Sequence, residues 1–156
     1  MKKALLSLLC FASLTLSGQI TSNLTDITGV WKGAYYQKNF LNPDDSALVY
    51  SAVMTVEQHN GEVTGSCYIF WYDDIKYYGK WTMEGVYDGL NFNFNETDIS
   101  EDNCKPGYSW CYKSVKSFVT LDAATGKWLL KGTFTGYTDF SSCAPGTLVF
   151  YKEGDV

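Results

Sequence analysis

Eight runs of strand-forming residues follow one another along this chain, and the connections between them alternate between tight turns and long polar loops. The runs cover residues 28–37, 48–58, 62–72, 77–87, 90–97, 111–122, 127–137 and 146–152. Two of the tight turns contain Asn60-Gly61 and Asp88-Gly89, and Asn-Gly is a strong hairpin signal. Because successive strands of a meander run antiparallel, every second connection falls at the same end. The alternation therefore predicts an all-β, eight-stranded antiparallel up-and-down β-barrel with one closed and one open end. A β-sandwich is the alternative, because strand periodicity does not show closure.

Apolar and polar residues alternate within most of these runs, so one set of side chains should face the inside of the barrel. A barrel of eight strands is either filled by its own side chains or holds one small ligand. The residues expected to line the lumen and contact such a ligand are Tyr50, Met54, Trp81, Phe92, Phe94, Trp128 and Phe134. Interior glycines such as Gly79 and Gly132 should make room beside the large rings.

The first 18 residues have the features of a bacterial secretory signal peptide. Lys2 and Lys3 precede a short apolar stretch over residues 4–16, and Ser17-Gly18 supplies small residues before Gln19. Removing residues 1–18 from 156 leaves 138, which predicts a single β-barrel domain over residues 19–156. We therefore expect a secreted or periplasmic protein. No other apolar run is long enough for a membrane-spanning helix.

The charge of the chain argues against nucleic acid as a partner. The formal net charge is -5, and losing the two signal lysines makes it -7, from -5 minus 2. All twelve basic residues are lysines, whereas nucleic-acid recognition uses positive patches and usually arginine. The oligomeric state is not evident from the sequence.

Four cysteines remain after the predicted cleavage, and an even number in an exported chain favours disulfides over a metal site. Cys104, Cys111 and Cys143 all fall at the predicted open end, whereas Cys67 lies within a strand. A bridge from Cys104 or Cys111 to Cys143 would tie two loops together. Cys104–Cys143 is slightly favoured because both residues are in loops, and a local Cys104–Cys111 bridge is the main rival.

The segment 26–33 resembles the Gly-x-Trp opening of the calycin superfamily, which contains lipocalin-like and avidin-like barrels. The motif is Gly29-Val30-Trp31, and the eight-strand plan extends the similarity to about residues 27–152. The resemblance implies that Trp31 packs across the closed end and that the barrel has a small-ligand role. The chain lacks the arginine that true lipocalins carry near the last strand, and the polar biotin-binding residues of avidins cannot be matched.

Residues of the kind that perform catalysis are sparse. His59, the only histidine, falls in the Asn-Gly turn with no serine or cysteine placed to use it. Adjacent carboxylates, Asp73-Asp74 and Glu101-Asp102, are poor candidates for an acid/base pair, since neighbours on one strand point apart. Glu96 and Lys116 are the only charged residues placed near the lumen, where an isomerase would need an acid/base group. We therefore expect no enzyme activity, no cofactor and no metal.

Acidic residues gather in the connections predicted for the open end. They are Asp44, Asp45, Asp73, Asp74, Asp98, Glu101, Asp102 and Asp139, which are eight of the 17 acidic residues. Such a face would attract a cationic ligand, a basic partner or calcium, and calcium is the weakest of these because the Asp spacing fits no EF-hand. The leading hypothesis is an exported, non-enzymatic barrel that holds a small apolar or aromatic ligand. The alternative is a protein- or glycan-interaction module with a filled barrel and an acidic loop face, and a barrel isomerase ranks third.

Overall fold

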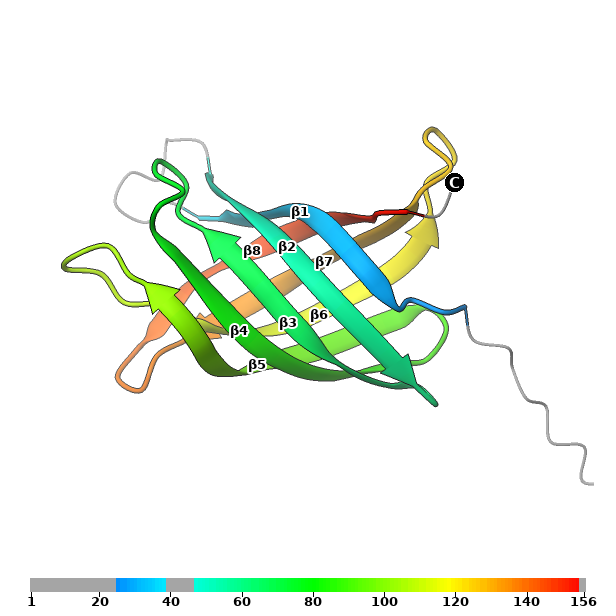
Figure 1. The fold of residues 1–156 in the computed structure, drawn as a ribbon, viewed down its shortest axis with the longest axis horizontal. Coiled ribbons are helices and arrows are strands. Elements are labelled where there is room, and N and C mark those ends of the chain that lie inside the picture. Colours follow the sequence, from blue (N-terminus) through cyan, green and yellow to red (C-terminus); the bar gives the residue numbers. More distant parts are fainter. Residues whose placement is uncertain (1–24, 39–46, 155–156) are drawn as a thin grey trace, which may run out of the picture.

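The computed structural model describes residues 25–38 and 47–154, and these form a closed β-barrel in which each strand pairs antiparallel with its neighbours in sequence (Figure 1). The strands are β1 (Gly29–Gln37), β2 (Leu48–His59), β3 (Glu62–Phe70), β4 (Tyr78–Tyr87), β5 (Asn91–Asn103), β6 (Tyr112–Leu121), β7 (Trp128–Tyr137) and β8 (Ser142–Lys152). β1 pairs with β8 and closes the barrel. The predicted all-β, up-and-down barrel is confirmed.

Parts of the predictions lie outside the described residues. These are the signal peptide over residues 1–18 and the acidic pair Asp44 and Asp45. Within residues 25–38 and 47–154 there is no helix of the length and apolarity needed to cross a membrane.

Tight hairpins and a tryptophan form the closed end of the barrel. Asn60 and Gly61 have φ angles of 51° and 85°, the positive pair that a type I′ hairpin turn requires. Trp31 is 1% exposed, and its indole Nε1 donates a hydrogen bond of 3.0 Å to the carbonyl of Ile27. Ile27 is itself buried, and its backbone N–H donates to the side chain of Gln58 on β2. The chain entering β1 therefore plugs this end.

The half of the lumen nearer the closed end is occupied by apolar side chains that alternate along the strands. Among its fully buried members are Trp31, Met54, Val56, Val63, Met83, Phe92, Phe94, Leu130 and Phe150. Phe92 and Phe94 pack ring against ring at 4.9 Å between centroids. Gly79 gives space as predicted, because a side chain there would collide with the indole of Trp81.

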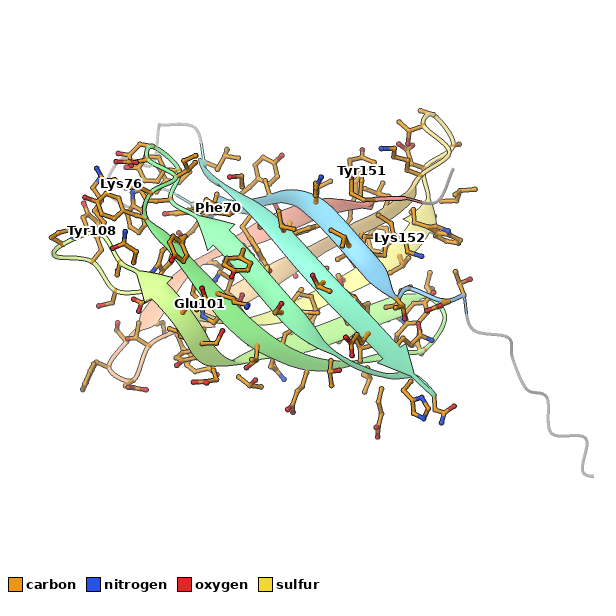
Figure 2. All side chains as sticks on the ribbon, in the orientation of Figure 1. Phe70, Lys76, Glu101, Tyr108, Tyr151 and Lys152 are labelled. Atoms are coloured by element: carbon orange, nitrogen blue, oxygen red, sulfur yellow. A yellow bond between two sulfur atoms is a disulfide. The ribbon has the colours of Figure 1, made fainter. Side chains whose placement is uncertain are left out.

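Two strands at the open end depart from the predicted boundaries. β5 continues to Asn103 instead of ending at Thr97, and it passes two irregularities in its pairing with β4 on the way. Asp98, Glu101 and Asp102 therefore lie on an exposed strand and not in a loop, which corrects the predicted acidic loop face. Figure 2 shows Glu101 on this outer surface. β8 begins at Ser142, four residues before the predicted start at residue 146. Its pairing with β7 is irregular between Phe134 and Gly136, and such an irregularity can accommodate a proline, here Pro145, within a strand.

The disulfide joins Cys111 to Cys143 and corrects the favoured Cys104–Cys143 pairing. Cys111 directly precedes β6 and Cys143 lies on β8, so the bridge reaches across β7, which separates the two strands. It passes over Gly136, where an added Cβ would lie 3.0 Å from the Cβ of Cys143 and 3.4 Å from that of Cys111. The Cα atoms are 6.5 Å apart, within reach of a bridge. The thiol of Cys104 instead donates to the carbonyl of Tyr108 within its own loop, at 3.2 Å.

Replacing both bridged cysteines by serine should lower the free energy of unfolding by about 2–4 kcal/mol, because the bridge closes a loop of 32 residues in the unfolded chain. Urea denaturation measures this loss. Chymotrypsin cleavage after Tyr108 or Trp110 separates Cys104 from Cys111. A non-reduced peptide map should then link the Cys143 peptide to the Cys111 peptide. A link from Cys143 to Cys104 would contradict the pairing.

Candidate functional site

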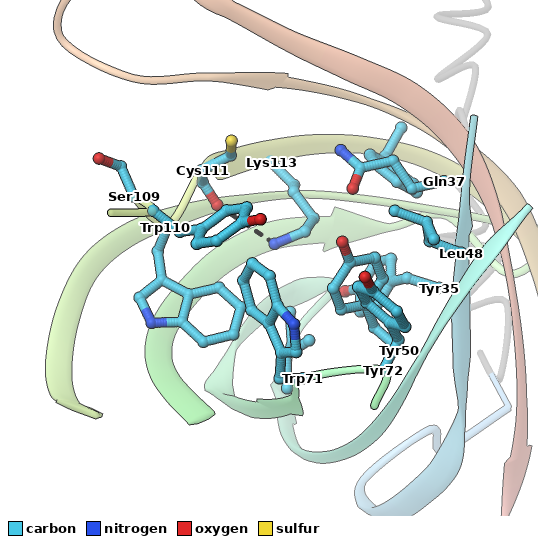
Figure 3. A pocket seen from close by; sticks show the side chains of 13 residues that line it. Tyr35, Gln37, Leu48, Tyr50, Trp71, Tyr72, Ser109, Trp110, Cys111 and Lys113 are labelled. Carbon is cyan, nitrogen blue, oxygen red and sulfur yellow. Dashed lines mark hydrogen bonds between the residues drawn. The ribbon is translucent and has the colours of Figure 1, made fainter. Parts of the chain in front are cut away.

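A cavity of about 290 Å³ opens at the end of the barrel opposite Trp31 (Figure 3). It lies where β1, β2, β3, β6 and β7 end or begin, beside the long loops that follow β3 and β5. Seven of its thirteen lining residues are aromatic, namely Tyr35, Tyr50, Trp71, Tyr72, Tyr108, Trp110 and Phe134. The part of the lumen at the open end is therefore a pocket with aromatic walls, and the part nearer the closed end is occupied by core side chains.

The two loops contribute the rings that form one wall of the pocket. Trp110, from the loop after β5, packs at 5.2 Å between centroids on Trp81 and at 5.4 Å on Trp71. Trp71, from the loop after β3, contacts Tyr108 at 4.9 Å and Tyr50 at 5.8 Å. Most of these pairs meet edge to face, the arrangement that ring quadrupoles favour. The loops are thus held inward by aromatic packing.

A buried ion pair lies beside the pocket. Lys113 on β6 places its ammonium Nζ 3.2 Å from Oε2 of Glu96 on β5. The Glu96 side chain is fully buried, whereas that of Lys113 is 10% exposed and lines the cavity. The same Nζ donates to the carbonyl of Cys111 at 3.2 Å, drawn as a dashed line in Figure 3. It also lies 4.5 Å from the ring centroid of Trp81 and 5.2 Å from that of Tyr35.

The ion pair forms where the ladder between β5 and β6 stops. Pairing of these strands runs from Asn91 with Phe118 to Asn95 with Ser114, so the next pair would be Glu96 with Lys113. There the Glu96 carboxylate replaces the backbone partner and accepts the N–H of Lys113 at 2.8 Å. The strands part beyond this point, which leaves room for Trp110 to turn inward. Glu96 thus completes the barrel wall while Lys113 adds its charge to the pocket.

Burial controls the protonation of the groups around this pair. Burial raises the pKa of the Glu96 carboxyl, and the neighbouring Lys113 charge offsets this only in part. Burial also raises the pKa of the Cys67 thiol to about 12, and Cys67 lies 3.9 Å from the hydroxyl of Tyr35. The pKa of Tyr50 is raised to about 12, chiefly by burial. Tyr50 and Cys67 are therefore neutral at physiological pH, and Cys67 is a poor nucleophile.

Two of the seven residues predicted to contact a ligand, Tyr50 and Phe134, line the cavity. Met54, Trp81, Phe92 and Phe94 are fully buried in the core and do not line it. Trp128 is half-buried at the start of β7, beside the turn of the closed end. The lumen face was therefore identified, but most of the predicted residues belong to its filled half.

The residues that give the pocket its character are not among those predicted from the sequence. Trp110 falls in a predicted loop, where no alternation assigns a direction. Trp71 could have been found, because it lies in the predicted strand 62–72 and continues the buried alternation of Cys67 and Ile69. Tyr35 could have been found, because it shares a face of its strand with Trp31. Lys116, the predicted lumen cation, is exposed, and Lys113 takes that place. The signal was available, since Lys113 alternates with the buried Val115, Ser117 and Val119.

The acidic residues of the open end do not form a negatively charged pocket within the described part of the chain. None of the described residues that line the cavity is Asp or Glu. Asp73 pairs with Lys105 at 3.1 Å and Asp74 with Lys76 at 2.6 Å, both on the surface. Glu101 pairs with Lys80 at 3.2 Å on the outer wall.

Within residues 25–38 and 47–154, no three His, Cys, Asp or Glu side chains gather closely enough to hold a metal ion. Comparison of the chain with protein-family models, with curated proteins and with solved structures found no match. The site must therefore be interpreted from its own chemistry.

Proposed function

We propose that this protein is an exported, non-enzymatic barrel of calycin type that binds a small apolar or aromatic ligand at the open end of its lumen. The observation that carries the proposal is the cavity of about 290 Å³ with its wall of aromatic side chains. Ligand sites are concave, mostly apolar and supplied with a few convergent polar groups, which is the composition found here. The volume is near the lower end for such sites, so the ligand is compact.

The cavity favours a ligand-binding role over the filled-barrel interaction module. An interaction module would use its outer wall and loops and would have no need of an interior space lined with aromatic rings. The isomerase hypothesis is weakened by the state of the buried charges. Glu96 has no exposed surface, and Lys113 is engaged by Glu96 and by the carbonyl of Cys111. Neither group is free to move a proton on a bound substrate.

Three features support export and the calycin resemblance. The disulfide between Cys111 and Cys143 is typical of proteins from oxidising compartments. The first 18 residues have the charge and apolar pattern of a signal peptide. Trp31 is buried at the closed end, which is the position that the Gly-x-Trp motif implies.

A calorimetric titration with a compact aromatic probe, 2-acetylnaphthalene, tests the binding role. We expect saturable binding with a negative heat-capacity change, because apolar surface is buried. Tyr50→Ala and Trp71→Ala should each weaken binding by about tenfold or more, as the loss of a central aromatic anchor does. Trp128→Phe is the matched control, since this half-buried indole lies at the closed end, and it should leave affinity unchanged.

Two results would contradict the proposal. The first is that the folded wild-type protein binds neither 2-acetylnaphthalene nor any of three other naphthalenes of similar size, namely 2-naphthoate, 2-ethylnaphthalene and 2-naphthylmethylammonium. The second is binding that Trp128→Phe weakens as much as Trp71→Ala does. In that case the probe would sit elsewhere on the barrel. Circular dichroism of each variant confirms that the barrel remains folded.

A further inference from the structure

We propose that the open-end cavity selects an aromatic ligand bearing a hydrogen-bond acceptor oxygen, a carbonyl or a carboxylate, and that the indole N–H of Trp71 donates to that oxygen. The inference rests on the proposed function, because it names the chemical class that the same cavity accepts. It goes further in assigning polarity to a pocket whose walls are mainly apolar.

The first observation is an unused hydrogen-bond donor. Trp71 lines the cavity and is only 6% exposed, yet its Nε1, like those of Trp81 and Trp110, is buried and has no hydrogen-bond partner among the described residues. A buried donor without a partner is costly, and native structures rarely leave one unexplained. In Figure 3 the indole nitrogen of Trp71 lies on the side of the ring turned toward Tyr50 and Tyr72, whose ring centroids each lie 5.8 Å from that of Trp71. An acceptor oxygen on a ligand would satisfy it.

The second observation is the positive charge at the cavity wall. Lys113 presents part of its side chain to the cavity, whereas its counter-ion Glu96 is wholly buried and does not line the space. A ligand entering from the open end therefore meets the ammonium before the carboxylate. Partial negative charge on a carbonyl, or full charge on a carboxylate, is favoured at that position.

The third observation argues against a cationic ligand, which an aromatic cage would otherwise suit. Protein cations already occupy the ring faces. The Nζ of Lys113 lies 4.5 Å from the Trp81 ring centroid, and the Nζ of Lys105 lies 5.7 Å from that of Trp71 and 5.9 Å from that of Tyr108. A ligand ammonium would approach these like charges without a carboxylate among the described lining residues to receive it.

Four naphthalenes of similar size test the assignment by calorimetry. They are 2-acetylnaphthalene, a neutral acceptor; 2-naphthoate, an anionic acceptor; 2-ethylnaphthalene, which has no polar atom; and 2-naphthylmethylammonium, a cationic donor. We expect both acceptors to bind about five- to tenfold more tightly than 2-ethylnaphthalene, the value of one net hydrogen bond. The ammonium compound should bind most weakly. Comparing naphthoate with the ketone then shows whether the natural group is charged or neutral.

The variant Trp71→Phe keeps a ring but removes the N–H donor. It should reduce the preference for 2-acetylnaphthalene over 2-ethylnaphthalene to about one, while Trp128→Phe should leave the preference intact. Equal binding of the ketone and the hydrocarbon to the wild type, tightest binding of the ammonium compound, or an unchanged preference in Trp71→Phe would overturn this inference and leave the proposed function standing. Absence of binding by all four compounds would refute the proposed function itself.

Discussion

Removing either member of the Glu96–Lys113 pair should destabilise the barrel by about 3–5 kcal/mol, the largest effect that we expect from a single polar substitution. Glu96→Leu leaves the buried ammonium of Lys113 without its counter-ion. The same change leaves the backbone N–H of Lys113 without an acceptor. Lys113→Met leaves the buried carboxylate unpaired. Urea denaturation at neutral pH measures both losses.

The double variant Glu96→Leu/Lys113→Met provides the control for charge. It should be more stable than either single variant, because no isolated charge remains in the wall. Glu96→Gln keeps the shape and an acceptor for the Lys113 N–H, so comparing it with Glu96→Leu separates the hydrogen bond from the ion pair. Losses in the two single variants that simply add in the double variant would show that the pair is not coupled.

The destabilisation by Lys113→Met should depend on pH. Burial raises the pKa of Glu96, and removing Lys113 takes away the charge that offsets this rise. A carboxyl whose pKa is raised in the folded state adds stability below its unfolded pKa and loses it as pH rises through the folded pKa. The variant should therefore approach wild-type stability on acidification from neutral pH, as Glu96 takes up a proton. A constant difference from pH 4 to pH 8 would contradict this.

Trp31→Ala should lower the free energy of unfolding by about 3–5 kcal/mol, with a marked fall in melting temperature. The indole is 1% exposed, fills the closed end and donates to the carbonyl of Ile27, so its removal leaves both a cavity and an unpaired acceptor. Trp31→Phe retains much of the packing and should cost less. Because Trp31 lies at the opposite end from the pocket, affinity for 2-acetylnaphthalene should be unchanged while the protein is folded.

A residue at the open end provides the opposite control, a substitution that should affect binding and not stability. Tyr72 lines the cavity and is 45% exposed, so Tyr72→Ala should change stability by only roughly 1 kcal/mol or less while weakening probe binding. Thermal denaturation and calorimetry of both variants separate the two roles. A nearly unchanged melting temperature for Trp31→Ala would show that the closed end does not depend on the tryptophan of the Gly-x-Trp motif.

The strands and turns of this protein could be predicted from residues that are neighbours in the sequence. Asn60-Gly61 specifies its turn because the two residues accept positive φ angles, which a type I′ hairpin needs. Alternation along β4 and β7 identified Trp81 and Phe134 as inward-facing, because a strand sends successive side chains to opposite faces. Strand count, order and the inner face all depend on neighbours in sequence, so the amino-acid sequence determines them by itself.

The site was decided by contacts between residues far apart in the chain. Trp110 lies in a segment without alternation, and its packing on Trp71 and on Trp81 holds that loop inward. Cys111 rather than Cys104 meets Cys143 because barrel closure sets both against Gly136. Glu96 contacts Lys113 because the backbone pairing between β5 and β6 ends at the preceding pair, Asn95 with Ser114. Such contacts arise only when the barrel closes, and this is why the pocket could be derived from the tertiary structure and not from local sequence pattern.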